Sequence, residues 1–269
     1  PSLSFSNLPI DPVNSTTTAN YYTYVTGGSW ELSSLFESTK HQDNAINDGD
    51  SYPGVYSIRS SQSPLTPGIR DMGLVGYYPM EEGSGTQTYD VSTNKGVGVF
   101  GGTLTWVTGC QVNSCLLFSD VSNSRITIPT TGFGTNKGSM SFWVKSTVVT
   151  PIDSYIFYHY NGGNRFYIRF YPTPSITLGV DEGTYSCTTN PFENSWIHYV
   201  LTYNSGRSYF YKNGSLVASD LSYSHNGIIF AATTQIGNGS GIDAYIDDVR
   251  IYNKALSNTE VAAIYNATK

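Results

Sequence analysis

The stretch GIDAYIDDVRIYNKALSNTEVAAIYN, residues Gly241–Asn266, decides the fold of this chain. Its first part, Tyr245–Tyr252, is rich in β-branched and aromatic residues, which predicts a strand. Asp247 has the same parity as Val249 and Ile251, so we expect its carboxylate to point the same way as core side chains. A buried carboxylate is unfavourable unless it is hydrogen-bonded, paired or bound to a cation, and the strand therefore predicts a partner for Asp247.

The rest of this stretch predicts a short helix directly after the strand. Ser257 and Glu260 have the spacing of a capping box, in which each side chain accepts a hydrogen bond from the other residue's backbone N–H. Val261, Ile264 and Tyr265 form an apolar stripe at positions i, i+3 and i+4, as on one face of a helix. We therefore expect the chain to end in an amphipathic helix that begins near Ser257.

Short strands and turn signals recur from Gly73 onward at the spacing of a β-sandwich. The run Ser139–Lys145 is apolar on both parities, which is typical of a central strand. In Arg165–Tyr171 apolar residues alternate with arginines and tyrosines, so one face is predicted to be buried. The dipeptide Asn213-Gly214 is the strongest hairpin signal and predicts a type I′ turn.

These motifs resemble those of a laminin-G-like, concanavalin A-like jelly-roll domain. The run IDDVRIYNKALS resembles its closing strand and helix. The other matches are LVGYYPMEEGSGT (Leu74–Thr86), SMSFWVK (Ser139–Lys145), WIHYVLTYNSG (Trp196–Gly206) and YFYKNGSLVAS (Tyr209–Ser219). The resemblance covers about Gly73 to Asn266 and implies an all-β fold, an antiparallel β-sandwich with a short C-terminal helix, for a domain of residues 73–269. Because this fold serves many purposes, it does not by itself define a function.

Residues 1–72 are expected to form a small β-rich segment followed by a linker. The run DPVNSTTTANYYTYVTGGSWELSSLFES (Asp11–Ser38) resembles the C-terminal β-region of type IV pilin-like proteins and pseudopilins. This resemblance implies the head of a surface appendage subunit whose partners are other pilin-like subunits. The alternative is an ordinary β-hairpin packed on the jelly roll. The abrupt start at Pro1 suggests an N-terminus removed by processing or by design.

Asp90 is a candidate calcium ligand together with Asp247. It lies in YDVSTNKGVGVFGG (Tyr89–Gly102), and in the resembling family the corresponding loop packs near the C-terminal strand, although Thr93 stands where that family usually has glycine. Oxygen ligands of this kind suit a structural calcium ion. The alternative is that Asp247 accepts backbone N–H bonds from the loop with no metal. Asp248, on the opposite parity, is predicted to pair with Arg250 or to face a concave surface.

A second oxygen-rich loop, HQDNAINDGDSYPG (His41–Gly54), gathers the side chains of Asp43, Asn47, Asp48 and Asp50. Such loops can hold calcium, but this one does not follow the EF-hand pattern. The alternative interpretation is a solvated turn.

Cys110 and Cys115 flank the short sequence QVNS, which is predicted to turn and bring the two thiols together. We expect a disulfide between them and an unpaired Cys187. The alternative is two free thiols. A disulfide is typical of an oxidising compartment and favours an extracellular or cell-surface location.

Several functional classes are disfavoured by composition and motif content. The net charge of −6 argues against a nucleic-acid partner, which would need a basic face. No apolar run approaches the roughly 18 residues of a membrane span. No Glu is followed two residues later by Asp, as glycosidases of the Glu-x-Asp-x-x-Glu type require, and there is no G-x-S-x-G motif. We therefore do not expect an enzyme.

Ligand binding, if present, is expected on aromatic side chains of a concave sheet. Arg165, Tyr167, Arg169 and Tyr171 share one face of a strand, where tyrosine rings can stack on sugars and arginines can hold carboxylates or hydroxyls. The alternative is that these tyrosines are partly buried sheet residues. The sequence thus predicts a non-enzymatic extracellular recognition or adhesion module that binds carbohydrate. The alternatives are a purely structural decoration of a filament and a glycan-cleaving enzyme.

Overall fold

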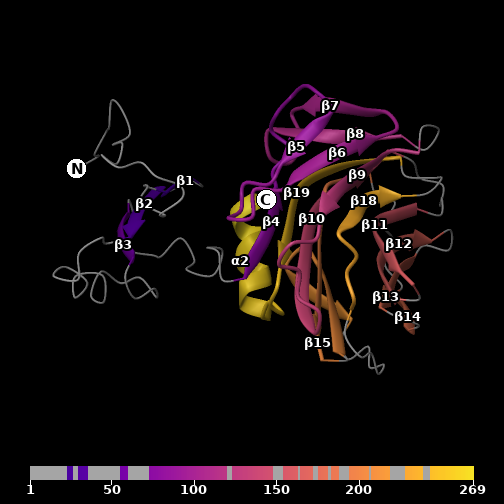
Figure 1. Cartoon of the computed structure of the whole chain (residues 1–269). Helices are drawn as coiled ribbons and strands as arrows, with labels where there is room; N and C mark the ends of the chain where they lie inside the picture. The colour runs from indigo at the N-terminus through magenta and orange to yellow at the C-terminus, as the bar shows by residue number, and fades with distance from the viewer. Residues whose placement is uncertain are drawn as a thin grey trace. The chain divides into compact units, whose positions relative to one another are not determined.

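A computed structural model provides the structure of the 269-residue chain. It describes residues 23–26, 30–35, 55–59, 73–119, 123–147, 154–162, 164–171, 175–180, 183–187, 194–205, 207–218, 228–238 and 243–269, with only the backbone described for β1–β3, for β14 and for most of β13. The chain divides into two compact units, Pro1–Arg70 and Asp71–Lys269, which are described separately (Figure 1).

The first unit contains a three-stranded antiparallel sheet in the order β1-β2-β3. Its strands are β1 (Thr23–Thr26), β2 (Trp30–Leu35) and β3 (Val55–Arg59). The β1–β2 pair agrees with the expectation of a small β-rich segment within residues 1–72. The candidate calcium loop with Asp43, Asn47, Asp48 and Asp50 lies outside the described residues.

The second unit is built from two eight-stranded antiparallel sheets. One, which we call the helix-side sheet, has the order β17-β16-β15-β10-β19-β8-β7, with β4 also paired to β19. Its strands are β4 (Leu74–Tyr78), β7 (Leu104–Thr108), β8 (Ser114–Phe118), β10 (Lys137–Ser146), β15 (Ile197–Asn204), β16 (Arg207–Lys212), β17 (Ser215–Ala218) and β19 (Ala244–Tyr252).

The other sheet, which we call the far sheet, has the order β14-β13-β12-β11-β18-β9-β6-β5. Its strands are β5 (Gln87–Tyr89), β6 (Val97–Gly101), β9 (Arg125–Pro129), β11 (Ser154–Asn161), β12 (Asn164–Tyr171), β13 (Ser175–Val180), β14 (Gly183–Cys187) and β18 (Thr233–Asn238). Figure 1 shows the two sheets as stacked layers, and the predicted antiparallel sandwich is confirmed.

The core lies between the sheets and is made by alternate residues of their strands. Phe142 and Val144 of β10 face Phe166 and Ile168 of β12 across the sandwich, within one continuous apolar cluster. All four side chains are at most 1% exposed. Burying a side chain of this size contributes roughly 1.5–3 kcal/mol, so this layer is the main source of stability.

The predicted type I′ turn joins β16 to β17. Asn213 and Gly214 both have positive φ, 50° and 77°, as this turn requires. Lys212 pairs with Ser215 across it, and the Asn213 side chain accepts a hydrogen bond from the His198 backbone N–H at 2.9 Å. The turn is thereby fixed to β15 as well.

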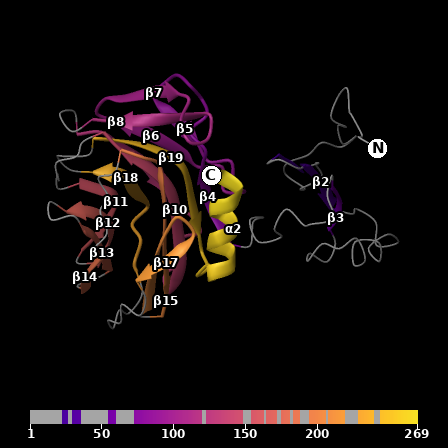
Figure 2. The ribbon, with the colours of Figure 1, turned by 180° about the vertical axis from the view of Figure 1, so that it is seen from behind.

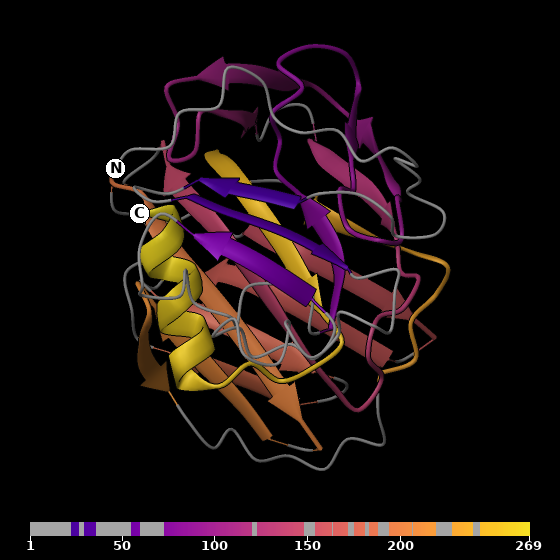
Figure 3. The same ribbon diagram turned by 90° about the vertical axis from the view of Figure 1, so that its left-hand side faces the viewer.

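Helix α2 (Asn258–Thr268) covers the outer face of the helix-side sheet (Figures 2 and 3). Ser257 and Glu260 form the predicted capping box, with both reciprocal hydrogen bonds present. Val261 and Ile264 are fully buried. The Tyr265 ring lies 5.7 Å from that of Trp143 in β10, so the helix packs directly on the sheet.

Candidate functional site

An aromatic–arginine ladder runs along the outer face of the far sheet, on two neighbouring strands. It consists of Tyr155, Tyr158 and Tyr160 of β11 and of Arg165, Tyr167 and Arg169 of β12. Three cross-strand pairs form its rungs: Tyr155 with Arg169, Tyr158 with Tyr167, and Tyr160 with Arg165. Facing residues on adjacent strands are close enough for their side chains to interact directly.

Strand alternation and one β-bulge place these side chains on the same face. In β12, Phe166, Ile168 and Phe170 point into the core, so the residues between them point outward. In β11 the pairing register shifts by one residue between Tyr155 and Phe157. The bulge lets two consecutive residues of β11 face the core and keeps the tyrosines on either side pointing outward.

The ladder is held together by ring–ring and cation–π contacts. The Arg165 guanidinium lies 5.7 Å from the centre of the Tyr160 ring, and the Arg169 guanidinium lies 5.3 Å from that of Tyr155. The Tyr155 ring also packs edge-on against Tyr158 and Tyr167, at 4.9 and 5.6 Å. Tyr160 is 52% exposed and Arg165 is exposed, so the end of the ladder at this rung is the part most open to a ligand.

The structure brings three of the four predicted ligand-binding residues onto one face: Arg165, Tyr167 and Arg169. The side chain of Tyr171 lies outside the described residues. Tyr167 is only 8% exposed, so at this position the alternative of a partly buried sheet residue holds. The three β11 tyrosines were missed because the bulge breaks the strict alternation that marks a strand face in sequence.

Asp90, the first predicted calcium ligand, is satisfied by hydrogen bonds from its own surroundings. Its Oδ1 accepts from the backbone N–H groups of Tyr77 and Ser92 at 2.8 and 2.7 Å. Its Oδ2 accepts from the Ser92 hydroxyl at 2.9 Å and from the Gly96 N–H at 3.3 Å. The carboxylate therefore closes its loop and fastens it to β4.

Asp247, the second predicted ligand, faces away from the core, contrary to the expectation from parity. Ser141 pairs with Arg250 and Trp143 pairs with Asp247, so β19 carries one extra residue at this point. Asp248, with φ of 53°, forms the resulting bulge. Ile246 and Val249 consequently both face the core, and Asp247 turns to the helix side with Trp143.

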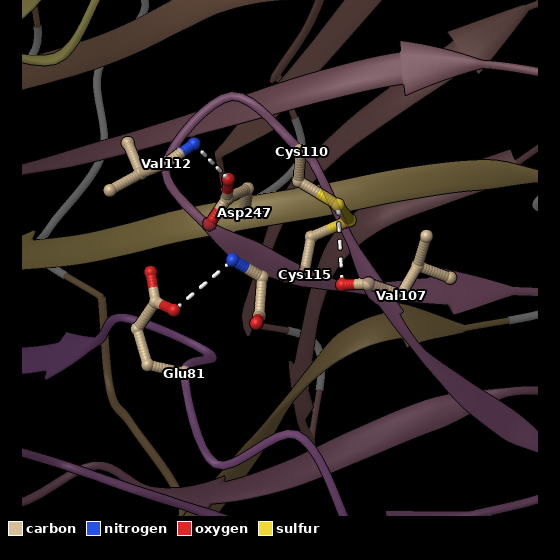
Figure 4. The surroundings of a disulfide bond; sticks show 7 residues. Glu81, Val107, Cys110, Val112, Cys115 and Asp247 are labelled. Carbon is tan, nitrogen blue, oxygen red and sulfur yellow. Dashed lines mark hydrogen bonds between the residues drawn. A yellow bond between two sulfur atoms is a disulfide. The ribbon is translucent and has the colours of Figure 1, made fainter.

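The Asp247 carboxylate is fully buried beneath the loop between β7 and β8 (Figure 4). Its Oδ2 accepts the Val112 backbone N–H at 2.8 Å, while Oδ1 makes no well-aligned hydrogen bond within the described part of the chain. Burial raises the pKa of this carboxyl to about 8, and the negative charges of Asp248 and Glu81 add to the rise. A protonated Asp247 is therefore favoured in the folded protein up to weakly basic pH.

A second buried polar group lies beside Asp247 on the same face. The Arg250 guanidinium donates to Asp248 Oδ1 at 3.0 Å and to the Tyr77 hydroxyl at 3.2 Å, and it stacks over the Tyr77 ring at 4.6 Å. The predicted pairing of Asp248 with Arg250 is thus confirmed. His198 contacts the Ser141 hydroxyl at 2.8 Å, and its burial, with the nearby Arg250 charge, lowers its pKa to about 3.

A search against protein-family models matches residues 120–262, just over half of the chain, to the concanavalin A-like lectin/glucanase superfamily under the laminin G model. The chain belongs to this superfamily. No curated protein sequence matches it. The comparisons give no support to the resemblance of residues 1–72 to pilin-like proteins, so that part of the interpretation stays a proposal.

Solved structures of botulinum neurotoxin binding domains share the fold of this lectin-superfamily chain. One is of neurotoxin type C, described as depending for its uptake on interaction with two ganglioside molecules, with 15% identity and a TM-score of 0.62. Another is the neurotoxin DC binding domain in complex with rat synaptotagmin II, with 15% identity and a TM-score of 0.61. The match to each covers 73% of this chain but only 51% and 52% of theirs, and at such identity it shows the fold alone.

The two residues predicted to bind calcium, Asp90 and Asp247, accept hydrogen bonds from different parts of the chain. The donors around Asp90 are N–H and O–H groups, and those around Asp247 belong to a different loop. Within the described ranges, no group of three or more His, Cys, Asp or Glu side chains gathers where it could hold a metal ion. Calcium binding at Asp247 stays a prediction that rests on its one unsatisfied oxygen.

Cys110 and Cys115 are joined by a disulfide, the pairing suggested by the sequence. The bridge closes the loop whose Val112 N–H reaches Asp247 (Figure 4), and Gln111 in the same loop donates to the Thr268 carbonyl at the end of α2 at 3.1 Å. The side chain of Cys187 lies outside the described residues. The disulfide loop therefore connects β19 to the C-terminal helix.

Among the helices that the structure describes, none has the length and apolar character needed to cross a membrane.

Proposed function

We propose that the protein is a non-enzymatic recognition module that binds carbohydrate through the aromatic–arginine ladder. The observation that carries this proposal is the juxtaposition of four tyrosines and two arginines on an outer sheet face, with the Tyr160–Arg165 rung exposed. Tyrosine rings offer flat apolar faces with a polar hydroxyl, and arginines offer forked donors, which together match the faces and hydroxyls of sugar rings.

Recognition is favoured over cleavage by the residues of the ladder strands. Neither β11 nor β12 contains Asp or Glu. Retaining glycosidases need two carboxyl groups about 5–5.5 Å apart, and inverting enzymes need a pair about 6.5–9.5 Å apart. A face built from tyrosines and arginines can hold a sugar but offers no acid–base pair of this kind.

A glycan array followed by titration calorimetry tests the proposal. We expect at least one oligosaccharide to bind the full chain and Tyr160→Ala to weaken it by about tenfold or more, equivalent to about 1.4 kcal/mol. The matched control is Tyr89→Ala, because Tyr89 is 50% exposed on β5, at the opposite edge of the same sheet. Equal losses in the two variants, or the absence of any glycan ligand, would contradict the proposal.

A location outside the cell belongs to the same proposal. It is supported by the Cys110–Cys115 disulfide, since such bonds persist in oxidising compartments. The resemblance of Asp11–Ser38 to pilin-like heads supports a finer version, in which the protein is the exposed part of a surface appendage subunit. Immunodetection in filaments sheared from intact cells is the expected result. Detection only in the intracellular fraction would overturn both versions.

A further inference from the structure

The far sheet is cationic in a protein that is acidic as a whole. The net charge of the chain is −6. Yet the eight strands of the far sheet contain three arginines, namely Arg125, Arg165 and Arg169, and no Lys, Asp or Glu. The acidic residues of the chain lie elsewhere, so the strands of this one sheet contribute only positive charge.

All three arginines occupy outward positions. Phe166, Ile168 and Phe170 of β12 alternate with Arg165 and Arg169 and fill the core. Likewise, Ile126 and Ile128 of β9 face the core, so Arg125 before them faces outward. The three arginine side chains therefore lie on the outer face of the sheet and not in the core of the sandwich.

Arg165 and Arg169 differ from Arg125 in having an aromatic partner. Each lies over a tyrosine ring of the neighbouring strand, Arg165 over Tyr160 and Arg169 over Tyr155. Arg125 instead donates from Nη1 to the carbonyl of Asn123 at 3.2 Å, two residues away. Of the three far-sheet arginines, the two in the ladder thus combine an aromatic ring with a guanidinium group, and in the Tyr160–Arg165 rung both residues are exposed.

We infer that the Tyr160–Arg165 rung binds a sugar that carries a carboxylate, such as a sialic or uronic acid. A guanidinium group matches a carboxylate with two parallel N–H···O bonds, which are stronger than bonds to a neutral hydroxyl. The tyrosine ring stacks on the apolar face of the same sugar ring. The far-sheet strands, whose only charged residues are arginines, provide charge complementarity to such a carboxylate. This inference rests on the proposed function and specifies its ligand class.

Calorimetric titration of the full chain tests the inference with three probes: lactose, sialyllactose and a uronic-acid disaccharide. We expect at least one acidic sugar to bind about tenfold or more tightly than lactose and to weaken as salt is raised, because exposed charges are screened. The sialic amide, in which the carboxylate is replaced by a neutral carboxamide, should lose this advantage. The sialyl and uronate arms identify which source of carboxylate the rung takes.

Three arginine variants locate the carboxylate contact. Arg165→Gln should remove the preference for the acidic sugar, and Arg165→Lys should restore only part of it, because an ammonium group lacks the planar fork. Arg125→Gln removes an equal charge from the same sheet outside the ladder and should leave the preference intact. Melting temperatures of all three check that they remain folded.

The possible results separate the inference from the function on which it rests. One contradicting result would be that lactose binds as tightly as sialyllactose and that binding is lost in Tyr160→Ala but kept in Arg165→Gln. This result would overturn the inference of a carboxylate ligand but would still support carbohydrate recognition. Equal losses in Arg125→Gln and Arg165→Gln would also overturn it, because general charge would then suffice. Failure of every sugar on the array to bind would overturn both.

Discussion

The two outer faces of the sandwich differ in the solvent exposure of their charged side chains. On the helix-side sheet, Asp247, Asp248 and Arg250 are buried: the disulfide loop lies over Asp247, and the Tyr77 ring of β4 packs on Arg250. On the far sheet, Arg165 lies over Tyr160 at an exposed rung, with no covering helix among the described residues. The same strand geometry thus produces a closed polar layer on one side and an accessible polar surface on the other.

This difference separates stability from recognition. Charges buried on the helix side are desolvated, so changing one of them alters the free energy of unfolding by several kcal/mol. Arg165 on the far sheet is exposed to solvent, so removing its charge should have little effect on folding, and its guanidinium group is accessible to a ligand. Substitutions of buried charged residues on the helix-side sheet should therefore change stability, whereas substitutions at the exposed rung of the far sheet should change ligand binding alone.

The largest effect is expected from Asp247→Asn, and it depends on pH. Burial raises the Asp247 pKa from 3.8 to about 8, so the folded protein keeps a proton that the unfolded chain has already lost between these pH values. The contribution of the Asp247 carboxyl to the free energy of unfolding is therefore greatest below about pH 4 and is lost as the pH rises toward 8. Asparagine carries no charge and still accepts the Val112 N–H. The free energy of unfolding of the variant should equal that of the wild type near pH 4. Near pH 8 it should be higher by on the order of 5 kcal/mol, since each pKa unit corresponds to about 1.4 kcal/mol.

Urea denaturation across this pH range measures the difference. Asp90→Asn is the matched control: its carboxylate accepts four hydrogen bonds, so losing the charge should destabilise the protein at neutral pH by about 1.5–3 kcal/mol. Near neutral pH we therefore expect Asp247→Asn to raise the free energy of unfolding and Asp90→Asn to lower it. Repeating the measurement with calcium and with chelator tests calcium binding, which would raise the melting temperature of the wild type but not of Asp247→Asn.

The next largest effect is expected from breaking the buried ion pair. Arg250→Ala leaves Asp248 buried without its partner and should lower the free energy of unfolding by about 3–5 kcal/mol. Adding Asp248→Asn should recover part of the loss, because no unpaired charge remains and asparagine tolerates the positive φ. Arg165→Ala on the far sheet is the control and should change stability by no more than about 0.5 kcal/mol. Similar losses at both arginines would erase the distinction between the faces.

Removing the disulfide should have a smaller effect. It closes a loop of only five residue steps, for which chain entropy predicts about 2 kcal/mol. The variant Cys110→Ala/Cys115→Ala avoids placing a hydroxyl at the fully buried Cys115 site. Reduced wild-type protein should show the same loss in thermal denaturation. A loss confined to the wild type under reduction, with none in the double variant, would mean that the bridge is not the stabilising feature.

Much of the fold was predictable from sequence because the signals are local. Alternation marked β12 and the central strands, Asn213-Gly214 marked a hairpin, and Ser257 with Glu260 marked the start of α2. The family model then confirmed the superfamily to which these motifs pointed. Each of these features depends on residues within a few positions of one another.

The errors arose at the two bulges, where one extra residue reverses which face a side chain occupies. The bulge at Asp248 places Asp247 on the helix side of the sheet and not in the core. The bulge after Tyr155 places Tyr155 and Tyr158, which are three residues apart, on the same face of β11. A bulge depends on pairing with a neighbouring strand, so the sequence of one strand does not reveal it. This explains why half of the ladder was missed and why Asp247 was expected to face the core.

The smallest effect on stability is expected from Tyr160→Ala and Tyr89→Ala. About half of each side chain already contacts water, so removing either ring should change the free energy of unfolding by no more than about 0.5 kcal/mol in urea denaturation. The two variants should nevertheless differ in sugar binding, because only Tyr160 faces an arginine across the strand pair. A loss of 2 kcal/mol or more in Tyr160→Ala alone would show that this ring supports the sheet. The exposed rung would then serve the fold in the way that the buried helix-side layer does, and weaker sugar binding by this variant would no longer identify a binding site.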